Sequence, residues 1–427
     1  MLASITKQPS AKVIGHRTCP DCGAEIPVQE GVRAWCERCN WNLGGEKAPL
    51  DEGFLARQYV RIGERYGSKV LERLKITPAT DLRPHWTMPK AVAFAIAAGV
   101  HLLSLGLLGL GIVLIPTGFP HVAPMLLGVG TCGFAWLLRP KPGRVPSRDV
   151  ASRKDFPALY ALVNEVAEEL GGQTIDNIVV NEDFNAAYGV LGWRRIPVLW
   201  IGLPLWIALR PQERVALLGH EVAHGVNGDG TRSFIAGSAL TALDEWIAFL
   251  RGPLRHATTW SEILGGSAIW IFSIPFALLQ SLLAQLFWFD KQRTEYFADY
   301  LGSTISGTNA AVSLLQRSEC KEHLDEVLLR NAYSTSQSGA HNLELFRERA
   351  RLPDREWQRL MRSSQSEGAR LDASHPPTAY RSSFLCTHMV EKPKMVATES
   401  AMRTIDAELA SLQEILGKRL IARHARD

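Results

Sequence analysis

Val215-Ala-Leu-Leu-Gly-His-Glu-Val-Ala-His-Gly-Val-Asn-Gly228 is the stretch of sequence that decides the fold. Histidines four residues apart lie on one face of a helix, so the imidazoles of His220 and His224 can bind one metal ion. Glu221 then lies beside the remaining coordination position, where a carboxylate can take a proton from a water that attacks a carbonyl. The alternative is an ordinary helix with two solvent-facing histidines. The pattern favours a zinc-binding helix that begins near Pro211 and stops at the final glycine.

A third zinc ligand is expected downstream, because a hydrolytic zinc site normally has three protein ligands. The candidate segment is Asp290-Lys-Gln-Arg-Thr-Glu-Tyr-Phe-Ala-Asp299, in which Glu295 and Asp299 share one helical face. One carboxylate can bind zinc while the other orients a zinc-binding histidine. Taken alone, this spacing usually marks a solvated helix face. Its pairing with the upstream motif, and the small Ala298 that permits close helix approach, favour the metal site.

Four of the seven cysteines form two CxxC pairs near the N-terminus, Cys19-Pro-Asp-Cys22 and Cys36-Glu-Arg-Cys39. Two such turns present four thiolates to one tetrahedral zinc ion, which predicts a structural zinc ribbon with Cys19, Cys22, Cys36 and Cys39 as ligands. A redox dithiol is the alternative, and it fits poorly without a thioredoxin-like βαβ pattern. The other cysteines are scattered, so no disulfide framework is expected.

Two apolar runs predict a helical hairpin that crosses a membrane and returns. Ala91–Ile115 has no formally charged residue and is long enough to span a hydrocarbon core, and Val122–Leu138 follows after a break at Pro116–Pro120. Basic residues flank the two outer ends of this hairpin: Lys75, Arg83 and Lys90 before it, and Arg139, Lys141, Arg144, Arg148, Arg153 and Lys154 after it. By the positive-inside rule both ends are cytoplasmic. A hairpin buried in a soluble protein is the alternative.

The segments around the zinc motifs carry further signals. Short strands are expected at Asn177–Val180 and Ile196–Ile201, and an amphipathic helix at about Thr398–Arg423. Between the zinc motifs, Ile263–Phe289 is uncharged and suited to span a membrane, whereas Phe234–Leu250 carries two acidic residues. If only one of them crossed, the downstream ligand would lie outside. Both therefore cross or both stay at the membrane surface, which leaves two or four spans open.

Two further motifs complete an ordered set of four. Asn185-Ala-Ala-Tyr-Gly189 precedes the zinc helix, and Ser374-His-Pro-Pro-Thr-Ala-Tyr-Arg381 follows the Glu295 segment. With these motifs the chain resembles, over roughly Pro89 to Phe384, the HtpX-like membrane-bound zinc metallopeptidases, relatives of the CaaX prenyl protease. Tyr188 stands where that family usually has a small residue.

The resemblance implies a gluzincin fold, a mainly helical domain with a small β-sheet. It implies that zinc is bound by His220, His224 and Glu295, that Glu221 is the catalytic base, and that Asp299 supports a ligand. It also implies that His375 and Arg381 lie near the site, where they would stabilise an oxyanion, and that the strand with Asn185 and Ala186 pairs with an extended substrate. Without the other motifs, the segment with His375 would be interpreted as a turn.

The expected fold is a mainly α membrane protein with an N-terminal zinc ribbon, a transmembrane helical hairpin and a gluzincin metallopeptidase domain with a small β-sheet. The expected units are the ribbon (1–48), a helical linker (49–88), the hairpin (89–139), the metallopeptidase domain (150–390) with a hydrophobic helical insertion at about 233–289, and a C-terminal helix (395–427).

The expected function is that of a membrane-anchored zinc endopeptidase with one catalytic and one structural Zn²⁺. Its expected partners are protein or peptide substrates and the lipid bilayer, with a further protein partner at the ribbon; the location is the cell (inner) membrane, with ribbon and active site on the cytoplasmic side. The balance of 47 basic and 43 acidic side chains argues against nucleic acid as a partner. The alternative is a catalytically idle membrane scaffold, and Glu221 argues against it because a structural zinc site needs no base.

Overall fold

The computed structural model describes residues 12–29, 32–43, 54–83, 85–137, 139, 143–146, 149–192, 194–255, 258–332, 338–366, 368–369 and 375–424. The described chain is mainly helical, with two small sheets, as the sequence predicts. Several predicted features lie outside the described residues: the ends of the ribbon at 1–11 and 44–48, the start of the linker at 49–53, Leu138, Lys141, Arg148 and Ser374.

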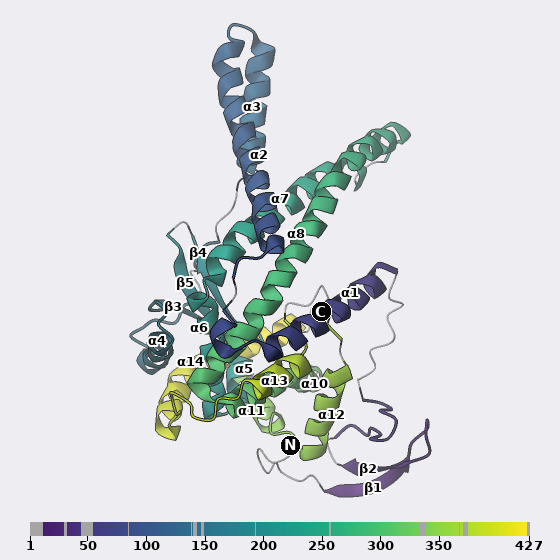
Figure 1. Ribbon diagram of the computed structural model, residues 1–427, viewed down its shortest axis with the longest axis vertical. Helices are drawn as coiled ribbons and strands as arrows, with labels where there is room; N and C mark the ends of the chain where they lie inside the picture. The colour runs from purple at the N-terminus through teal and green to yellow at the C-terminus, as the bar shows by residue number, and fades with distance from the viewer. Residues whose placement is uncertain are drawn as a thin grey trace.

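The N-terminal unit is a two-stranded antiparallel sheet of β1 (Val13–Thr18) and β2 (Glu25–Gln29), with the four cysteines in the turns beside it. It lies at the bottom of Figure 1, against α12 (Asp354–Ser366). Between this unit and the first hairpin run α1 (Phe54–Ile76) and the short turn η1 (Ala79–Asp81). Helix α1 packs beside α13 (Thr378–Thr387), so the linker is part of the folded domain.

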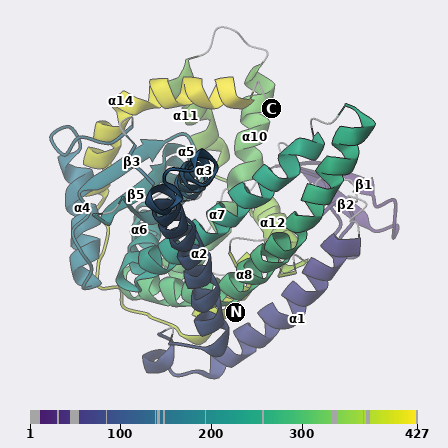
Figure 2. The same ribbon diagram turned by 90° about the horizontal axis from the view of Figure 1, so that it is seen from above.

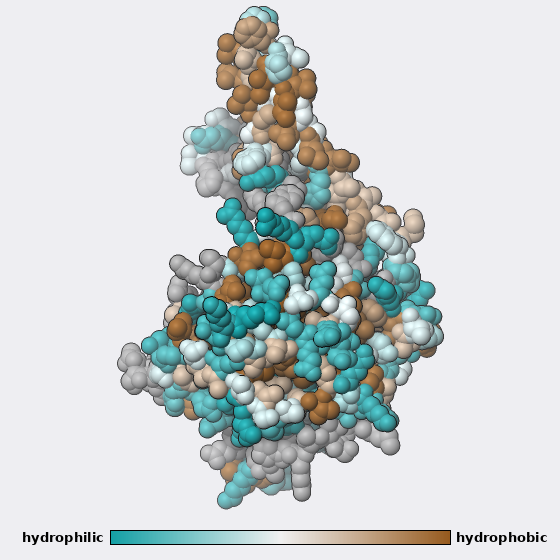
Figure 3. Space-filling model, turned by 90° about the vertical axis from the view of Figure 1, so that its left-hand side faces the viewer, coloured by the Kyte–Doolittle hydropathy of each residue, from teal (hydrophilic) through white to brown (hydrophobic). Residues whose placement is uncertain are grey.

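Two helical hairpins leave the domain from the side opposite the ribbon and diverge (Figure 1). The first consists of α2 (Met88–Gly118) and α3 (Val122–Leu137), and the second of α7 (Asp229–Arg255) and α8 (Trp260–Ser306). By length and composition, α2 and α8 are long and apolar enough to cross a membrane. Large apolar side chains cover the first hairpin in Figure 3, and many on both hairpins are exposed, such as Leu102 at 66% and Phe272 at 69%.

The break in the first hairpin lies later than predicted. Helix α2 continues through Pro116 and ends at Gly118, so the turn lies at 119–121 rather than at Pro116–Pro120. A proline inside a helix removes one hydrogen bond of the ladder. One lost bond near the end of a long apolar helix does not stop it, and the helix ends where Phe119 adopts an extended conformation.

Polar contacts join the hairpins near the domain and within the second hairpin. Lys90 Nζ of α2 lies 3.3 Å from Asp290 Oδ2 of α8; the Lys90 side chain is buried and that of Asp290 is partly buried. Lys90 is therefore part of an ion pair between the two hairpins. Within the second hairpin, Gln280 donates to Asp244 and Arg251 Nε donates to Ser273 Oγ at 3.0 Å. Two charged residues of α7, Asp244 and Arg251, thus have polar partners on α8, which allows a helix with charged residues to pack beside a mostly apolar one.

The remaining elements form the globular domain. They are α4 (Pro157–Glu169), β3 (Asn177–Asn181), β4 (Ala186–Leu191), β5 (Ile196–Gly202), α5 (Leu203–Ala208), α6 (Pro211–Val226), α9 (Thr308–Arg317), η2 (Ser318–Cys320), α10 (Lys321–Ala332), α11 (Gly339–Arg349), α12, α13 and α14 (Glu399–His424). The strand order is β3-β5-β4, with β5 parallel to β3 and antiparallel to β4. Strand β4 includes most of the Asn185–Gly189 motif and lies at the edge of the sheet, as the resemblance implies; its pairing with β5 was not predicted.

The core of the domain lies between the sheet and the helices around it (Figure 2). Its fully buried side chains come from α4, β3, β5, α5 and α6 and from the C-terminal helices, and they include Leu159, Ile178, Leu199, Trp206 and Leu218. Helix α6 is buried along nearly its whole length, from Glu213 to Ala223. Burial on both sides fixes the rotation of α6 and therefore the direction in which its histidines point.

Helices α6 and α8 cross where a glycine of one faces a glycine of the other. A Cβ atom on Gly302 would lie 3.0 Å from the backbone nitrogen of His220, and one on Gly219 would lie 3.1 Å from Cα of Gly302. The sequence drew attention to Ala298 as the small residue, and Ala298 is fully buried. The close backbone approach, however, depends on Gly302, one turn further along α8.

Gly302→Ala is expected to push α8 away from His220 and to lower the free energy of unfolding by about 1–3 kcal/mol, the usual cost of overpacking. Gly237→Ala is the matched control, because Gly237 is also helical and a Cβ atom there meets nothing within 4 Å. The control should be neutral or slightly stabilising. Thermal unfolding of the purified proteins in detergent measures both, and equal midpoints would contradict the close crossing.

Candidate active site

Two helices supply the predicted zinc ligands. Helix α6 carries His220 and His224, and α8 carries Glu295. The three ligand atoms lie within 4.8 Å of one another, although Glu295 is more than seventy residues from the histidines in the sequence. The insertion predicted at about 233–289 comprises most of α7 and the first part of α8, so one unbroken helix runs from its second half to Glu295.

The distances between these atoms fit a tetrahedral zinc ion. His220 Nε2 lies 3.3 Å from His224 Nε2, and the Glu295 carboxylate oxygens lie 3.7 Å and 3.9 Å from those two nitrogens. Bonds of about 2.0–2.2 Å in a tetrahedron put ligand atoms roughly 3.3–3.6 Å apart. Small shifts would therefore bring all three atoms to one ion, so the residues present suit the metal.

Asp299 and Arg381 hold His220 in place. Asp299 Oδ1 lies 3.0 Å from His220 Nδ1, which leaves Nε2 directed at the metal position. Arg381 donates two hydrogen bonds to the Asp299 carboxylate, from Nε at 2.7 Å and from the terminal nitrogen at 2.6 Å. Burial alone would raise the pKa of Asp299, but Arg381 and His220 lower it, so the carboxylate is ionised at neutral pH.

His375 plays a similar part for Glu295. Its Nδ1 lies 2.6 Å from Glu295 Oε2, and its side chain is 41% exposed. Burial would raise the pKa of Glu295, but the imidazoles of His375, His224 and His220 lower it well below its usual range. An ionised, fixed carboxylate is the form that binds zinc.

Glu221 lies in the helix turn of the two histidines and is 7% exposed. Its charge also acts on Arg381, whose pKa is raised because the neighbouring carboxylates outweigh the effect of burial, with Asp299 the strongest. The structure thus brings together the residues predicted for the catalytic site. They come from α6, α8, α13 and the segment just before α13: His220, Glu221, His224, Glu295, Asp299, His375 and Arg381.

The Asn185 segment lies at the sheet edge beside α6. The Asn185 carbonyl accepts from Gly202 N at 2.8 Å, and Ala186 pairs with Ile201 in the register of β4 and β5. Strand β4 ends the sheet, so within the described residues its outer edge has no strand partner. Tyr188 packs on Gly225 of α6, where a Cβ atom would lie 2.6 Å from the Tyr188 ring. The large residue at this motif position is thus accommodated by a glycine next to His224.

The second cluster is the cysteine site of the ribbon. Cys19 Sγ lies 3.5 Å from Cys39 Sγ, Cys22 Sγ lies 3.5 Å from Cys36 Sγ, and all four atoms are within 4.8 Å of one another. Zinc–sulfur bonds of about 2.3 Å in a tetrahedron separate sulfur atoms by roughly 3.8 Å. This cluster therefore also suits zinc.

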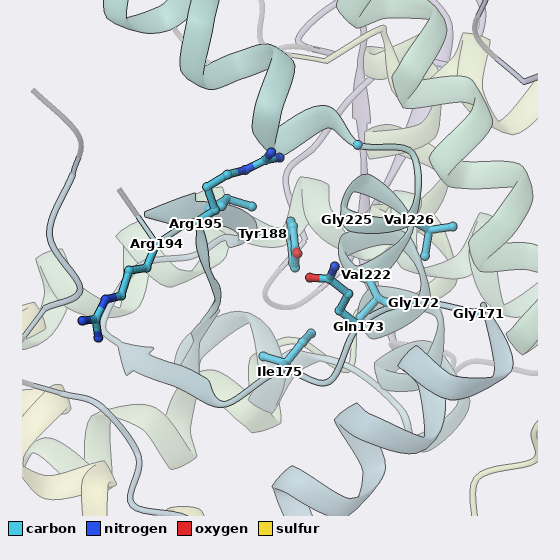
Figure 4. Close-up of a pocket in the computed structure, with 12 residues that line it drawn as sticks. Gly171, Gly172, Gln173, Ile175, Tyr188, Arg194, Arg195, Val222, Gly225 and Val226 are labelled. Carbon is cyan, nitrogen blue, oxygen red and sulfur yellow. The ribbon is translucent and has the colours of Figure 1, made fainter. Parts of the chain in front are cut away.

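A cavity of about 540 Å³ lies on the other face of α6 (Figure 4). It is lined by Val222, Gly225 and Val226 of α6, by Tyr188, and by the Gly171–Gln173 loop. Helical spacing places these α6 residues away from His220 and His224. The cavity is therefore separate from the metal cluster.

Sequence analysis missed two features that build the site. One is the pair of glycines at the crossing, signalled only by Gly219 immediately before His220 and by Gly302 three residues after Asp299. The other is the ion pair of Lys90 and Asp290, whose opposite charges lie at the domain ends of two apolar runs.

With the geometry established, comparison with known proteins identifies the family. A model of peptidase family M48 matches residues 154–388, more than half of the chain. The chain belongs to peptidase family M48. The matched residues of this M48 chain include all seven catalytic-site candidates and exclude the ribbon and the first hairpin.

The names of two curated relatives also indicate a protease. Protease HtpX of Stutzerimonas stutzeri (strain A1501) is 29% identical over 206 residues, which cover 46% of this chain and 70% of that protein. Protease HtpX of Pseudomonas putida (strain GB-1) is 26% identical over 170 residues, 39% of this chain and 57% of that protein. The chain thus aligns with little more than half of the P. putida relative. No solved structure matches the chain.

Asp299→Asn is expected to weaken zinc binding at the histidine site by about 10–100-fold, because an amide neither fixes the His220 tautomer nor balances Arg381. Asp149→Asn is the control, because Asp149 also pairs with an arginine, Arg419 at 2.7 Å, but on the surface. Competition with a zinc chelator measures both. Equal affinity in the two variants would show that Asp299 does not support the ligand.

Proposed function

We propose that this M48 chain is a membrane-anchored zinc endopeptidase whose active site faces the cytoplasm. The observation that carries the proposal is the convergence of His220, His224 and Glu295, with the Glu221 carboxylate on the same helix turn. A structural zinc site has no use for a base beside an incomplete ligand set. The family match and the names of the relatives support peptidase chemistry.

Zinc held by the three ligands would polarise the scissile carbonyl and lower the pKa of a water. The Glu221 carboxylate would accept a proton from the attacking water and donate it to the leaving amine. Asp299 and Arg381 act through His220, because Nε and one terminal nitrogen of Arg381 bind the Asp299 carboxylate, and that terminal nitrogen also lies 3.5 Å from the His220 ring. This geometry favours a positioning role for Arg381 over the oxyanion role expected from the resemblance.

His375 is the better candidate to stabilise the oxyanion, because its side chain is partly exposed while its Nδ1 is held by Glu295. The unpaired edge of β4 would bind an extended peptide through main-chain hydrogen bonds. Such binding requires an unfolded or flexible segment of the substrate rather than one particular side chain, which is consistent with a role in protein quality control.

Glu221→Gln is expected to retain zinc at both sites, about two ions per chain, and to lose about 10²–10⁴-fold or more in cleavage of denatured casein, because a proton acceptor is missing. Glu168→Gln on α4 is the control, an exposed carboxylate on the same domain. Metal content and cleavage are measured on the same preparations. If the wild type binds zinc and cleaves nothing, the scaffold alternative is favoured.

The membrane part of the proposal rests on the two hairpins. Many of their large apolar side chains are exposed, as on the first hairpin in Figure 3. Exposing so much apolar surface is unfavourable in water and favourable in lipid. The second hairpin must return α8 to the side of α6, because Glu295 meets His220. We therefore place α7 and α8 in the membrane together, as a paired hairpin.

Arg139 and Arg144, both described after α3, are consistent with a cytoplasmic domain. His121→Cys, in the turn between α2 and α3, is expected to react with an impermeant maleimide in intact cells. Arg403→Cys, on the exposed face of α14, should react only after lysis. Thr258→Cys between α7 and α8 tests whether that hairpin also reaches the far side. Labelling of Arg403→Cys in intact cells would show that the domain faces the outside of the cell, the opposite of the proposed orientation.

A further inference from the structure

The ribbon binds one face of α12 through three arginines. Arg355 donates to Glu37 Oε1 and to the Trp35 carbonyl, both at 2.8 Å. Arg359 donates to the Leu43 carbonyl at 2.7 Å. Arg362 donates to the backbone carbonyl of Glu37 at 2.6 Å. The ribbon therefore offers carbonyl oxygens at fixed positions to one helix face, and those positions depend on the two cysteine turns.

An aromatic side chain completes this contact. The Trp35 ring has no exposed surface, and the guanidinium groups of Arg355 and Arg362 lie 5.1 Å and 5.2 Å from its centre. Trp35 immediately precedes the metal ligand Cys36. A tryptophan between two cations is held by cation–π attraction and by burial. Loss of the metal would therefore directly affect the residue that α12 holds.

The middle of α12 is also fixed. Burial would raise the pKa of Glu356, but hydrogen bonds from His323 and Arg359 lower it to about 2. Arg359 is thus shared between Glu356 on its own helix and the Leu43 carbonyl of the ribbon. Removing the ribbon would leave this buried guanidinium with an unmet hydrogen bond.

The opposite face of α12 reaches the active site. Trp357 and Leu360 pack with Cys320 of η2. The adjacent Glu319 accepts a hydrogen bond from Thr378 Oγ1 at 2.6 Å. Thr378 is the first residue of α13, and Arg381, one turn later, holds Asp299 and through it His220.

A second set of contacts leads to α6. The guanidinium of Arg317 lies 5.7 Å from the Trp357 ring centre and donates to Glu213 at 2.8–3.0 Å. Glu213 lies in the first turn of α6, two turns before His220. Helix α12 is therefore held between the ribbon and the two elements that position the His220 imidazole.

We propose that the ribbon is an internal brace for the active site. With its metal bound, it holds α12 against η2 and so keeps α13 and Arg381 in position. Loss of the ribbon metal, or of the ribbon–α12 contact, lowers turnover while zinc stays at the histidine site. The turnover part of this inference rests on the proposed peptidase function; the structural coupling does not.

The first test uses Arg355→Ala with Arg362→Ala, which keeps all four cysteines and removes two of the three arginines that bind the ribbon, including both that lie over the Trp35 ring. The control is Arg349→Ala with Arg403→Ala, which removes two exposed arginines from α11 and α14. The test variant should keep zinc at both sites, lose about tenfold in kcat with little change in KM, as expected for a group that supports a ligand, and exchange amide hydrogens faster in α12 and α13. The control should match the wild type in all of these.

A second variant, Cys36→Ser with Cys39→Ser, removes the ribbon metal. It should bind about one zinc ion and show the same faster exchange in α13. The proposal is overturned if either variant loosens α12 while α13 exchange stays at the control level, or if kcat falls only because the histidine site has lost its zinc. Exchange and metal content are also measured on Glu221→Gln protein. Faster exchange in α13 of the ribbon variants, together with a wild type that binds zinc and cleaves nothing, would refute the peptidase function and leave the brace standing.

Discussion

Helices α6 and α8 cross with Gly219 against Gly302, and the site depends on that contact. The backbones approach so closely that a Cβ atom on Gly302 would lie 3.0 Å from His220 N. Only at this separation do the Glu295 oxygens come within 3.7–3.9 Å of the two imidazoles. Because α6 is buried on nearly all sides, it cannot rotate to compensate for a larger spacing.

Ion pairs and hydrogen bonds fix the orientation of the side chains that the helix crossing brings together. Two buried carboxylates, Glu295 and Asp299, lie one turn apart on α8, and each is balanced from α13 or the segment before it. Arg381 balances Asp299 and His375 contacts Glu295, so neither carboxylate is left unpaired in the interior. The same pairs set the direction of the ligand atoms, which is how a buried charge network serves a metal site.

Helix α8 is one continuous helix that belongs both to the second hairpin and to the active site. The helix carries exposed apolar residues in its first part and the buried carboxylates of Glu295 and Asp299 in its last. The ion pair of Lys90 and Asp290 joins it to α2 at the junction. At the other end of the domain the ribbon binds one face of α12. The opposite face of α12 contacts η2, and Trp357 on that face contacts Arg317. The active site thus lies between the apolar hairpins on one side and the small cysteine-bearing ribbon on the other.

The sequence by itself determined the local chemistry: His220 and His224 on one helix face, Glu295 and Asp299 on another, four cysteines in two turns, and two apolar runs long enough to be helices α2 and α8. These follow from periodicity and ligand spacing, which are properties of neighbouring residues. Only the tertiary structure decided that Gly302 rather than Ala298 makes the close crossing, that Arg381 is held by Asp299, that Tyr188 fits over Gly225, and that the ribbon contacts α12. Each of these contacts joins residues from different elements, and their distances depend on packing that no local pattern encodes.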